Sequence, residues 1–231
     1  MEMQIDWNSL QSEIRRNGYA IIDYVLNNEE CDSLIQDYNN LELYRKTVHM
    51  ERYRFGKGEY KYFTYPLPQI IENLRTTIYP HLVPIANEWH RKLKLNEYFP
   101  QRLTDLQELC RSKEQRLATP LILKYGVGGY NTLHQDLYGE VYFPMQAVLM
   151  LSEPNNEYKG GEFVLTMQVP RAQSKAIVLR PNKGSMLIFP TNYLPKEGKR
   201  GYYKTKMKHG VSEVLEGQRY SLGIIFHDAL K

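Results

Sequence analysis

The sequence predicts a mainly β chain in which an N-terminal helical layer supports a β-sandwich or jelly-roll core. Strand-like segments follow one another from residue 120 onward, turn residues separate them, and helical patterns are confined to the region before them. No linker, repeat or low-complexity tract interrupts the 231 residues. We therefore expect one domain over 1–231, with a helical support layer and leading strand at 1–118 and a jelly-roll core at 119–231.

The N-terminal segment predicts a helix, a strand and a second helix. The first helix should end near Gly18, because glycine readily adopts the left-handed conformation of a C-cap. Residues 19–25 are mostly apolar or aromatic and predict the strand. Asn27 or Asn28 can cap the second helix, which continues through Ile35.

The middle of the chain predicts two more helices after an aromatic and polar stretch at 51–66. Residues 69–95 have one apolar face with helical spacing. Pro80 and Pro84 are expected to interrupt this helix, because the proline ring removes a hydrogen-bond donor and crowds the preceding turn. A charged helix should follow at roughly 100–117.

The C-terminal half predicts a series of short strands. They are 121–125, 143–151, 161–168, 175–179, 185–189, 206–214 and 219–227. Turn signals separate them at Gly128-Gly129, at 154–156, at 181–184 and at Glu216-Gly217. Strands at this spacing are typical of a sandwich or jelly roll.

Composition narrows the class of protein and its compartment. The hydrophobic fraction is 42%, no apolar run approaches the roughly 18 residues of a membrane span, and the N-terminus lacks the pattern of a signal peptide. The two cysteines, Cys31 and Cys110, have no paired spacing, so we expect buried thiols in a cytoplasmic protein. A net charge of +4 permits an acidic partner without requiring one.

A candidate metal site starts at His134 and Asp136, which follow the glycine-rich turn at 126–131. We expect them on one strand, where side chains two residues apart point to the same face and can reach one ion. His209 can supply a third ligand. Two histidines and one carboxylate with open positions opposite are typical of a non-haem Fe(II) oxygenase. The isolated His-X-Asp triplet is more often an ordinary hydrogen-bonded pair, but the order of motifs through Arg219 favours the metal site.

Arg219 follows His209 by ten residues and suits a bound dicarboxylate, because a guanidinium fork matches carboxylate geometry. The Glu216-Gly217 turn is expected to bring Arg219 onto a strand that neighbours the strand of His209. In these features the chain resembles the 2-oxoglutarate/Fe(II)-dependent oxygenase superfamily, whose fold is the double-stranded β-helix. The resemblance implies that His134, Asp136 and His209 bind iron and that Arg219, Ser221, Tyr125 and Asn131 bind the cosubstrate.

Five stretches also resemble a bacterial group of these oxygenases proposed to act on nucleic acids. They are 58–63, 134–140, 160–165, 209–212 and 223–228. The resemblance implies Fe(II), 2-oxoglutarate and O2 as cofactors, with stimulation by ascorbate. It implies hydroxylation or oxidative demethylation of the substrate, with release of succinate and CO2.

Three groups of residues bear on the substrate. Residues 196–208 combine lysines and arginine with two tyrosines, which suits a path for single-stranded nucleic acid but also a solvated edge strand. The aromatic residues of 53–65 can form a lid that stacks on a base, or can pack the helical layer against the sheet. A second basic group, Arg171, Lys175 and Arg180, can line the mouth of the core or be ordinary surface.

Three functional hypotheses follow. The first is a 2-oxoglutarate oxygenase acting on a base of single-stranded or damaged nucleic acid. The second is the same chemistry on a protein side chain or small metabolite, as in prolyl hydroxylases. The third is a metal-binding jelly roll without catalytic activity. No membrane partner is expected.

Overall fold

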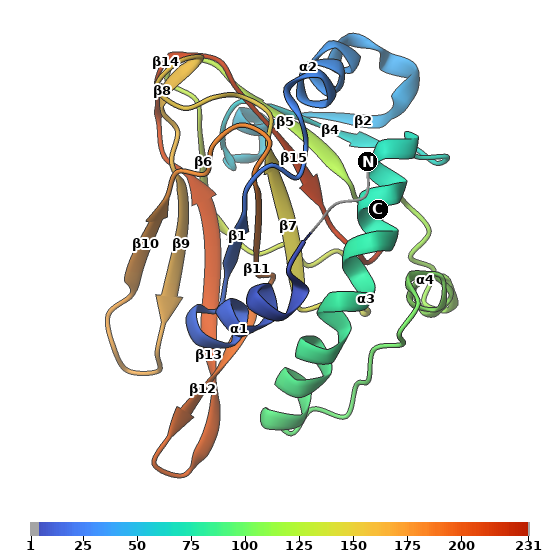
Figure 1. Ribbon diagram of the computed structural model, residues 1–231, viewed down its shortest axis with the longest axis vertical. Helices are drawn as coiled ribbons and strands as arrows, with labels where there is room; N and C mark the ends of the chain where they lie inside the picture. Colours follow the sequence, from blue (N-terminus) through green and yellow to red (C-terminus); the bar gives the residue numbers. More distant parts are fainter. Residues whose placement is uncertain (1–4, 231) are drawn as a thin grey trace.

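The computed structural model describes residues 5–230, and its two main sheets are antiparallel and face each other (Figure 1). The predicted mainly β class with a jelly-roll core is confirmed. The larger sheet has the strand order β1-β11-β7-β15-β5-β4-β2. The smaller sheet has the order β10-β9-β13-β6-β3, with β12 paired to β13, and a separate pair is formed by β14 and β8.

The strands of the large sheet are β1 (Ala20–Ile22), β11 (Met186–Pro190), β7 (Met145–Met150), β15 (Arg219–Ile224), β5 (Leu121–Tyr125), β4 (Glu59–Phe63) and β2 (Tyr44–His49). Those of the smaller sheet are β10 (Lys175–Leu179), β9 (Phe163–Gln168), β13 (Gly201–Val211), β6 (Tyr130–His134), β3 (Gly56–Lys57) and β12 (Tyr193–Gly198). The remaining pair is β14 (Val214–Gly217) and β8 (Tyr158–Gly160).

Local sequence explains the short helices at the N-terminus. Helix α1 (Trp7–Asn17) is capped by Asp6 and ends, as predicted, at Gly18, which has a φ of 85°. Helix α2 (Asn28–Gln36) is capped by Asn27 in a capping box with Glu30. Single turns of 3-10 helix follow as η1 (Asp37–Asn39), η2 (Leu41–Leu43) and η3 (Met50–Tyr53).

The longest helix, α3 (Gln69–Lys92), is continuous, so the predicted interruption at Pro80 and Pro84 is wrong. Pro84 has no N–H to donate to the carbonyl of Pro80, and the side chain of Gln101 donates to that carbonyl instead at 2.9 Å. The buried apolar face of α3 packs on the outer face of the large sheet, and this burial outweighs the missing bonds. Helix α4 (Leu103–Ser112) lies beside it and is shorter than the predicted 100–117.

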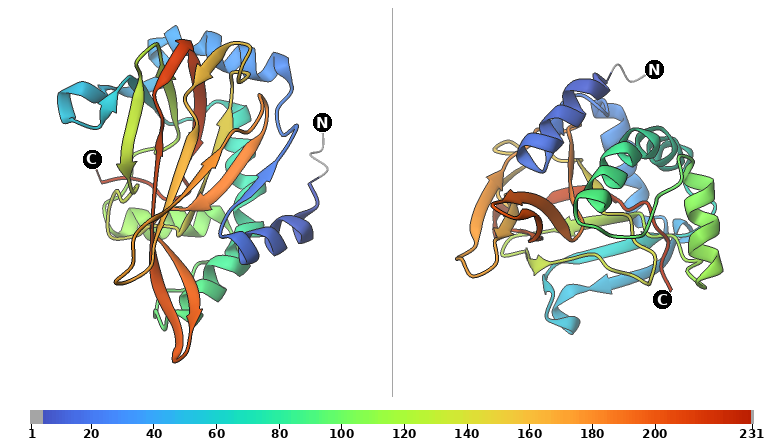
Figure 2. Two further views of the ribbon diagram at one scale, coloured as in Figure 1. Left: turned by 90° about the vertical axis from the view of Figure 1, so that its left-hand side faces the viewer. Right: turned by 90° about the horizontal axis from the view of Figure 1, so that it is seen from below.

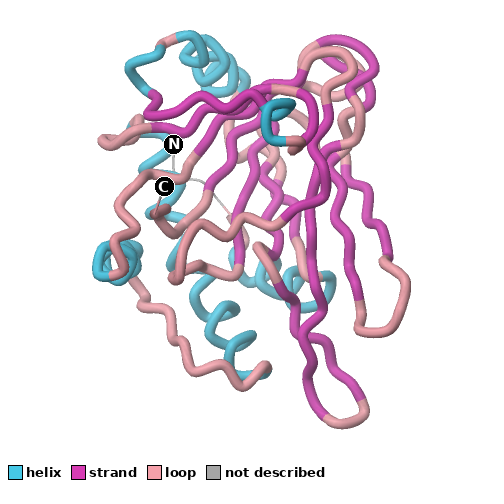
Figure 3. Tube along the Cα trace, turned by 180° about the vertical axis from the view of Figure 1, so that it is seen from behind, coloured by secondary structure: helices cyan, strands magenta, loops and turns pink. Residues whose placement is uncertain are grey.

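The region before residue 119 does more than support the core. It supplies β1 at one edge of the large sheet, β2 and β4 at the other edge, and β3 to the smaller sheet. The predicted strand 206–214 is also wrong at both ends, because β13 starts at Gly201 and the chain leaves the sheet after Val211. Strands β12 and β13 form a hairpin that extends beyond the ends of both sheets (Figures 1 and 3).

Because the helices lie outside the sheets, the space between the two sheets is available for a binding site. Helices α3 and α4 lie on the outer side of the large sheet, as Figure 2 shows from below. The inner faces of both sheets line one cavity of about 220 Å³. Within residues 5–230, no helix combines the length and apolar character required to cross a membrane.

Candidate metal centre and its cavity

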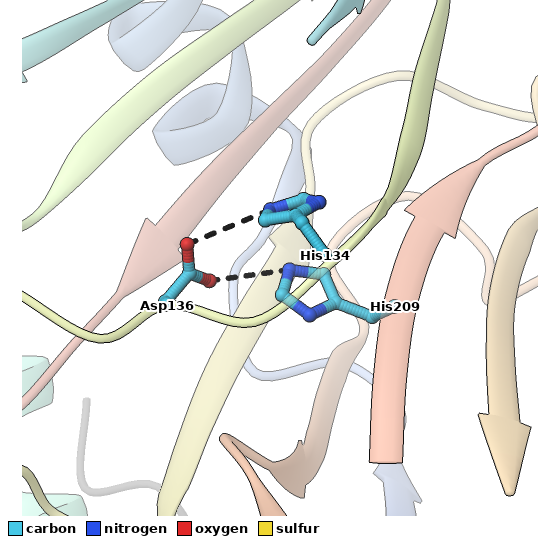
Figure 4. Close-up of side chains that lie close together, drawn as sticks. All are labelled: His134, Asp136 and His209. Atoms are coloured by element: carbon cyan, nitrogen blue, oxygen red, sulfur yellow. Dashed lines mark ion pairs between the residues drawn. The ribbon is translucent and has the colours of Figure 1, made fainter. Parts of the chain in front are cut away.

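The structure brings the three predicted metal ligands together between the sheets (Figure 4). Nε2 of His134 lies 3.5 Å from Oδ1 of Asp136, and Nε2 of His209 lies 3.2 Å from Oδ2. Metal–ligand bonds of about 2.1 Å place adjacent octahedral ligands about 3 Å apart, so these side chains fit one ion. Asp136 lies beyond the end of β6, and its predicted position on the strand is therefore wrong.

Hydrogen bonds and burial set the orientation of the His134 ring and shift the pKa values of His134 and His209. Nδ1 of His134 lies 2.8 Å from the carbonyl of Thr132, which orients the ring with Nε2 toward Asp136. Burial acts to lower the pKa of His134, but the hydrogen bond and charge of Asp136 raise it above its ordinary value. Burial, together with the nearby His134, lowers the pKa of His209.

Asp136 is held by Tyr138 as well as by the histidines, and Tyr62 supports Tyr138 in turn. The hydroxyl of Tyr138 donates to Oδ1 of Asp136 at 2.6 Å, and the hydroxyl of Tyr62 donates to Tyr138 at 3.1 Å. Burial acts to raise the pKa of Asp136, yet His209 and His134 hold it well below its usual range. The carboxylate is therefore fixed in its charged form, with Oδ2 on the side of His209.

Tyr138→Phe is expected to weaken metal binding by about 10- to 100-fold, because the lost bond leaves the ligand carboxylate free to rotate. A competition titration with Co(II) and a chelating dye measures the affinity. Tyr62→Phe is the matched control, since Tyr62 bonds to Tyr138 but makes no hydrogen bond to Asp136, and it should have a smaller effect. Equal affinities of wild type and Tyr138→Phe would show that Asp136 needs no support from this hydroxyl.

Arg219 lies in the same cavity as a buried cation, only 1% exposed. Its Nη1 donates to Ser221 Oγ at 3.1 Å, its Nη2 faces Met150 Sδ at 3.4 Å, and its Nε has no partner among the described residues. No carboxylate within residues 5–230 forms an ion pair with it. A buried charge without a counter-ion is costly, so the site fits an anionic ligand such as one carboxylate of 2-oxoglutarate.

The sheet register places the other predicted cosubstrate residues beside Arg219. Tyr125 on β5 pairs with Arg219 on β15, and the hydroxyl of Tyr125 accepts a hydrogen bond from Asn131 at 3.3 Å. Burial raises the pKa of Tyr125 to about 12, so its hydroxyl keeps its proton as a donor. Arg219 and His209 are in opposite sheets, however, so the expected placement on neighbouring strands is wrong.

All seven predicted site residues line this one cavity, and their roles in binding remain predictions. The seven are Tyr125, Asn131, His134, Asp136, His209, Arg219 and Ser221. The cavity is also lined by three residues that the sequence did not predict, Tyr62, Tyr138 and Gln146. Tyr138 could have been predicted from its position two residues after Asp136. Tyr62 on β4 and Gln146 on β7 are far from the metal ligands in sequence, so no local pattern could have identified them.

Gly161 makes room for Arg219, because a Cβ at this position would lie 2.9 Å from Cδ of Arg219. Its φ of 61° is also unfavourable for other residues. Gly161→Ala should displace the guanidinium and raise the KM for 2-oxoglutarate several-fold, as measured by succinate release. The control is Gly201→Ala, which has a φ of 104° but open space around the added Cβ. Identical changes in both variants would attribute the effect to backbone strain alone.

The sequence matches known proteins over most of its length. Residues 58–229 match an oxygenase family described as catalysing oxidative methylation of damaged DNA. Two uncharacterized proteins of Mycobacterium tuberculosis, from strains CDC 1551 / Oshkosh and ATCC 25618 / H37Rv, are 43% identical over 167 residues. In each case the match covers 72% of this chain and 72% of the relative.

Solved structures share the fold at low sequence identity. A prolyl-4-hydroxylase of Pseudomonas putida has a TM-score of 0.59 at 13% identity, with 96% of this chain and 98% of that chain covered. A 2OG-Fe(II) oxygenase family protein of Burkholderia pseudomallei has a TM-score of 0.56 at 14% identity, covering 98% and 93%. A prolyl hydroxylase of Trichoplax adhaerens, in complex with a hypoxia inducible factor peptide fragment, has a TM-score of 0.53 at 14% identity, covering 96% and 89%.

Proposed function

We propose that this chain, which belongs to this oxygenase family within the 2-oxoglutarate/Fe(II)-dependent superfamily, oxidises a methylated base of single-stranded or damaged nucleic acid. As a member of the family, it is an enzyme that uses Fe(II), 2-oxoglutarate and O2. Iron is assigned to His134, Asp136 and His209. The distal carboxylate of 2-oxoglutarate is assigned to Arg219 with Ser221, and Tyr125 and Asn131 are assigned to the rest of the cosubstrate.

The bound cofactors supply an oxidation in which one atom of O2 enters a substrate C–H bond, while the other leaves in succinate as 2-oxoglutarate loses CO2. On an N-methyl group, the resulting C–OH carbon departs as formaldehyde and its hydroxyl proton passes to the nitrogen. The protein contributes position and enclosure. Arg219 fixes one end of the cosubstrate, Tyr138 orients the ligand carboxylate, and the buried walls exclude water.

An aromatic pair at the mouth of the cavity supports the nucleic-acid substrate. The rings of Tyr53 and Phe55 stack at 5.5 Å with an interplanar angle of 20°, and Phe55 lines the cavity. Both remain about half exposed, at 54% and 46%. Thr132 binds the carbonyl of Phe55 through its N–H and its hydroxyl, both at 2.8 Å, two residues before His134. A flat, partly exposed aromatic surface beside the metal ligands suits stacking on a base.

Basic side chains near this surface suit a phosphate backbone. Arg52 and Arg54 flank Tyr53 and are exposed. The predicted basic segment 196–208 does not add to them, because Lys204 and Lys206 alternate with the buried His209, Met207 and Thr205 and point to the other face of the sheet. The predicted second basic group contributes less, because Arg180 pairs with Glu162 at 2.6 Å. The lid predicted for 53–65 is also smaller than expected, since its later residues form β4 inside the large sheet.

Phe55→Ala tests this assignment most directly. Wild-type enzyme should release more succinate, together with formaldehyde, when a methylated single-stranded oligonucleotide is added, and the stimulation should fall at high salt. Loss of stacking in Phe55→Ala should reduce it by about tenfold or more. Tyr98→Ala is the control, because Tyr98 is 76% exposed and lies outside the residues that line the cavity.

The outcomes separate the candidate substrates. Asp136-dependent succinate release that ignores every oligonucleotide, methylated or not, would exclude the base as substrate. Stimulation by a peptide in the same assay would then assign the chemistry to a protein side chain. Equal stimulation of wild type and Phe55→Ala would remove the aromatic pair from the substrate path.

A further inference from the structure

Gln146 is a buried polar residue of the cavity that has no role in the site described above. It lies on β7, is 3% exposed and lines the cavity. Its Nε2 has no hydrogen-bond partner among the described residues. A buried amide without a partner costs stability, so its presence in a functional cavity points to a ligand that supplies the partner.

Other polar side chains of the cavity near the metal ligands have partners, apart from Nδ1 of His209. The amide of Gln135 donates to Asn192 and to the carbonyl of Met207 at 2.7–3.0 Å. The hydroxyl of Tyr62 donates to that of Tyr138, and the hydroxyl of Tyr138 donates to Asp136, as described above. Among the described side chains beside the metal ligands that do not themselves bind the metal, the amide nitrogen of Gln146 is therefore a free donor.

The sheet register places Gln146 close to the metal ligands. Gln146 pairs with Phe189 on β11, and the ring of Phe189 lies 4.8 Å from the ring of His209. The neighbouring residue Ala147 pairs with Ile224, which is five residues along β15 from Arg219. Five residues of strand extend roughly 16 Å.

A cosubstrate anchored at Arg219 leaves Gln146 available. 2-Oxoglutarate has four C–C bonds of about 1.5 Å, so its carbon chain spans no more than about 6 Å. The strand register places the neighbour of Gln146 roughly 16 Å from Arg219, beyond the reach of a cosubstrate held there. Gln146 is therefore left free to contact the substrate.

We propose that Gln146 determines substrate specificity by donating its amide N–H to an acceptor atom on the edge of the methylated base. This inference rests on the proposed nucleic-acid function. The bond holds the base with its methyl group toward His134, Asp136 and His209, while Phe55 stacks at the mouth. The surrounding side chains, among them Val148, Leu121 and Phe189, are apolar, which strengthens a single directional bond.

The test uses Gln146→Leu and Gln146→Met, which keep the side-chain volume and remove the donor. Both should lose about 10- to 100-fold in kcat/KM for a methylated single-stranded oligonucleotide. Their affinities for Co(II) and 2-oxoglutarate should stay within twofold of wild type. Their melting temperatures should not fall, because no native hydrogen bond of Nε2 is lost. Gln135→Leu is the matched control, and its melting temperature should fall since its amide loses its acceptors on Asn192 and Met207.

A series of oligonucleotides in which each acceptor atom of the methylated base is replaced by C–H locates the bond. With wild type, one analogue should lower kcat/KM by the same factor as the Gln146→Leu substitution does. With Gln146→Leu, that analogue should cause no further loss of kcat/KM. Stimulation of the two Gln146 variants equal to that of wild type would overturn the inference and leave the proposed function standing. Weakened 2-oxoglutarate binding would overturn it by placing Gln146 at the cosubstrate. A wild type that no oligonucleotide stimulates would overturn both.

Discussion

Asp136→Ala is expected to reduce succinate release to the level of the protein-free reaction, because the substitution removes the anionic ligand between two imidazoles. Metal addition should raise the melting temperature of wild type and leave that of Asp136→Ala unchanged, since a ligand stabilises only the state that binds it. Thermal unfolding with and without Mn(II) measures this. Asp105→Ala is the control, because its partly exposed carboxylate pairs, among the described residues, only with Arg102 and Thr104. A metal-dependent rise that persists in Asp136→Ala would place the metal elsewhere.

The same variant has a pH-dependent effect on the metal-free protein. The pKa of Asp136 is lowered in the folded state, so the carboxylate stabilises the fold above the ordinary carboxyl pKa of about 3.9. That contribution is lost as the pH falls through the lowered value. Metal-free Asp136→Ala should therefore be less stable than wild type at neutral pH, and the two should converge in strong acid.

Arg219→Leu is expected to weaken 2-oxoglutarate binding by about 30- to 5,000-fold, which corresponds to a loss of about 2–5 kcal/mol for a buried charge-assisted pair. The melting temperature without cosubstrate should stay constant or rise, because Arg219 has no carboxylate partner within residues 5–230 to leave unpaired. Calorimetric titration of 2-oxoglutarate into Mn(II)-loaded protein, with thermal unfolding in parallel, measures both effects.

Arg75 is a matched control for Arg219, since both guanidinium groups are buried. Arg75 pairs with Asp228 at 3.2 Å and also donates to Tyr65 and to the carbonyl of Phe226. Arg75→Leu leaves the Asp228 carboxylate buried without its charged partner, so it should cost about 3–5 kcal/mol of stability. The melting temperature should stay constant or rise in Arg219→Leu and should fall in Arg75→Leu. If Arg219→Leu is destabilised as much as Arg75→Leu, the role of Arg219 is structural.

The candidate site was more predictable than the fold around it. The spacing of His134 and Asp136 was enough to place both at one point, even though the strand ends at His134. The carboxylate of Asp136 still lies 3.5 Å from Nε2 of His134, so the error in the strand boundary did not matter. Arg219 could be assigned by its resemblance to a known motif, but the sheet that holds it could not be derived from its distance along the chain.

The missed strands have physical causes. Strand β4 contains Lys61, which is only 6% exposed and would be expected in solvent. Its ammonium lies 4.1 Å from the centre of the Tyr38 ring and donates to the carbonyl of Tyr38 at 2.9 Å, contacts that local sequence does not reveal. In β13, the exposed Lys204 and Lys206 alternate with the buried Thr205 and Met207. That alternation belongs to a long hairpin, whose length depends on pairing with β12.

The position of β15 has a consequence for synthesis on the ribosome. β15 is the last of the described strands in the chain, yet it lies in the middle of the large sheet, between β7 and β5. Until it is translated, the strands on its two sides have no hydrogen-bonded neighbour in common. A nascent chain therefore has two open sheet edges, which are slow to close and prone to mispairing. The strand that completes the sheet also carries Arg219, so the cosubstrate pocket can form only after residues 219–224 have been translated.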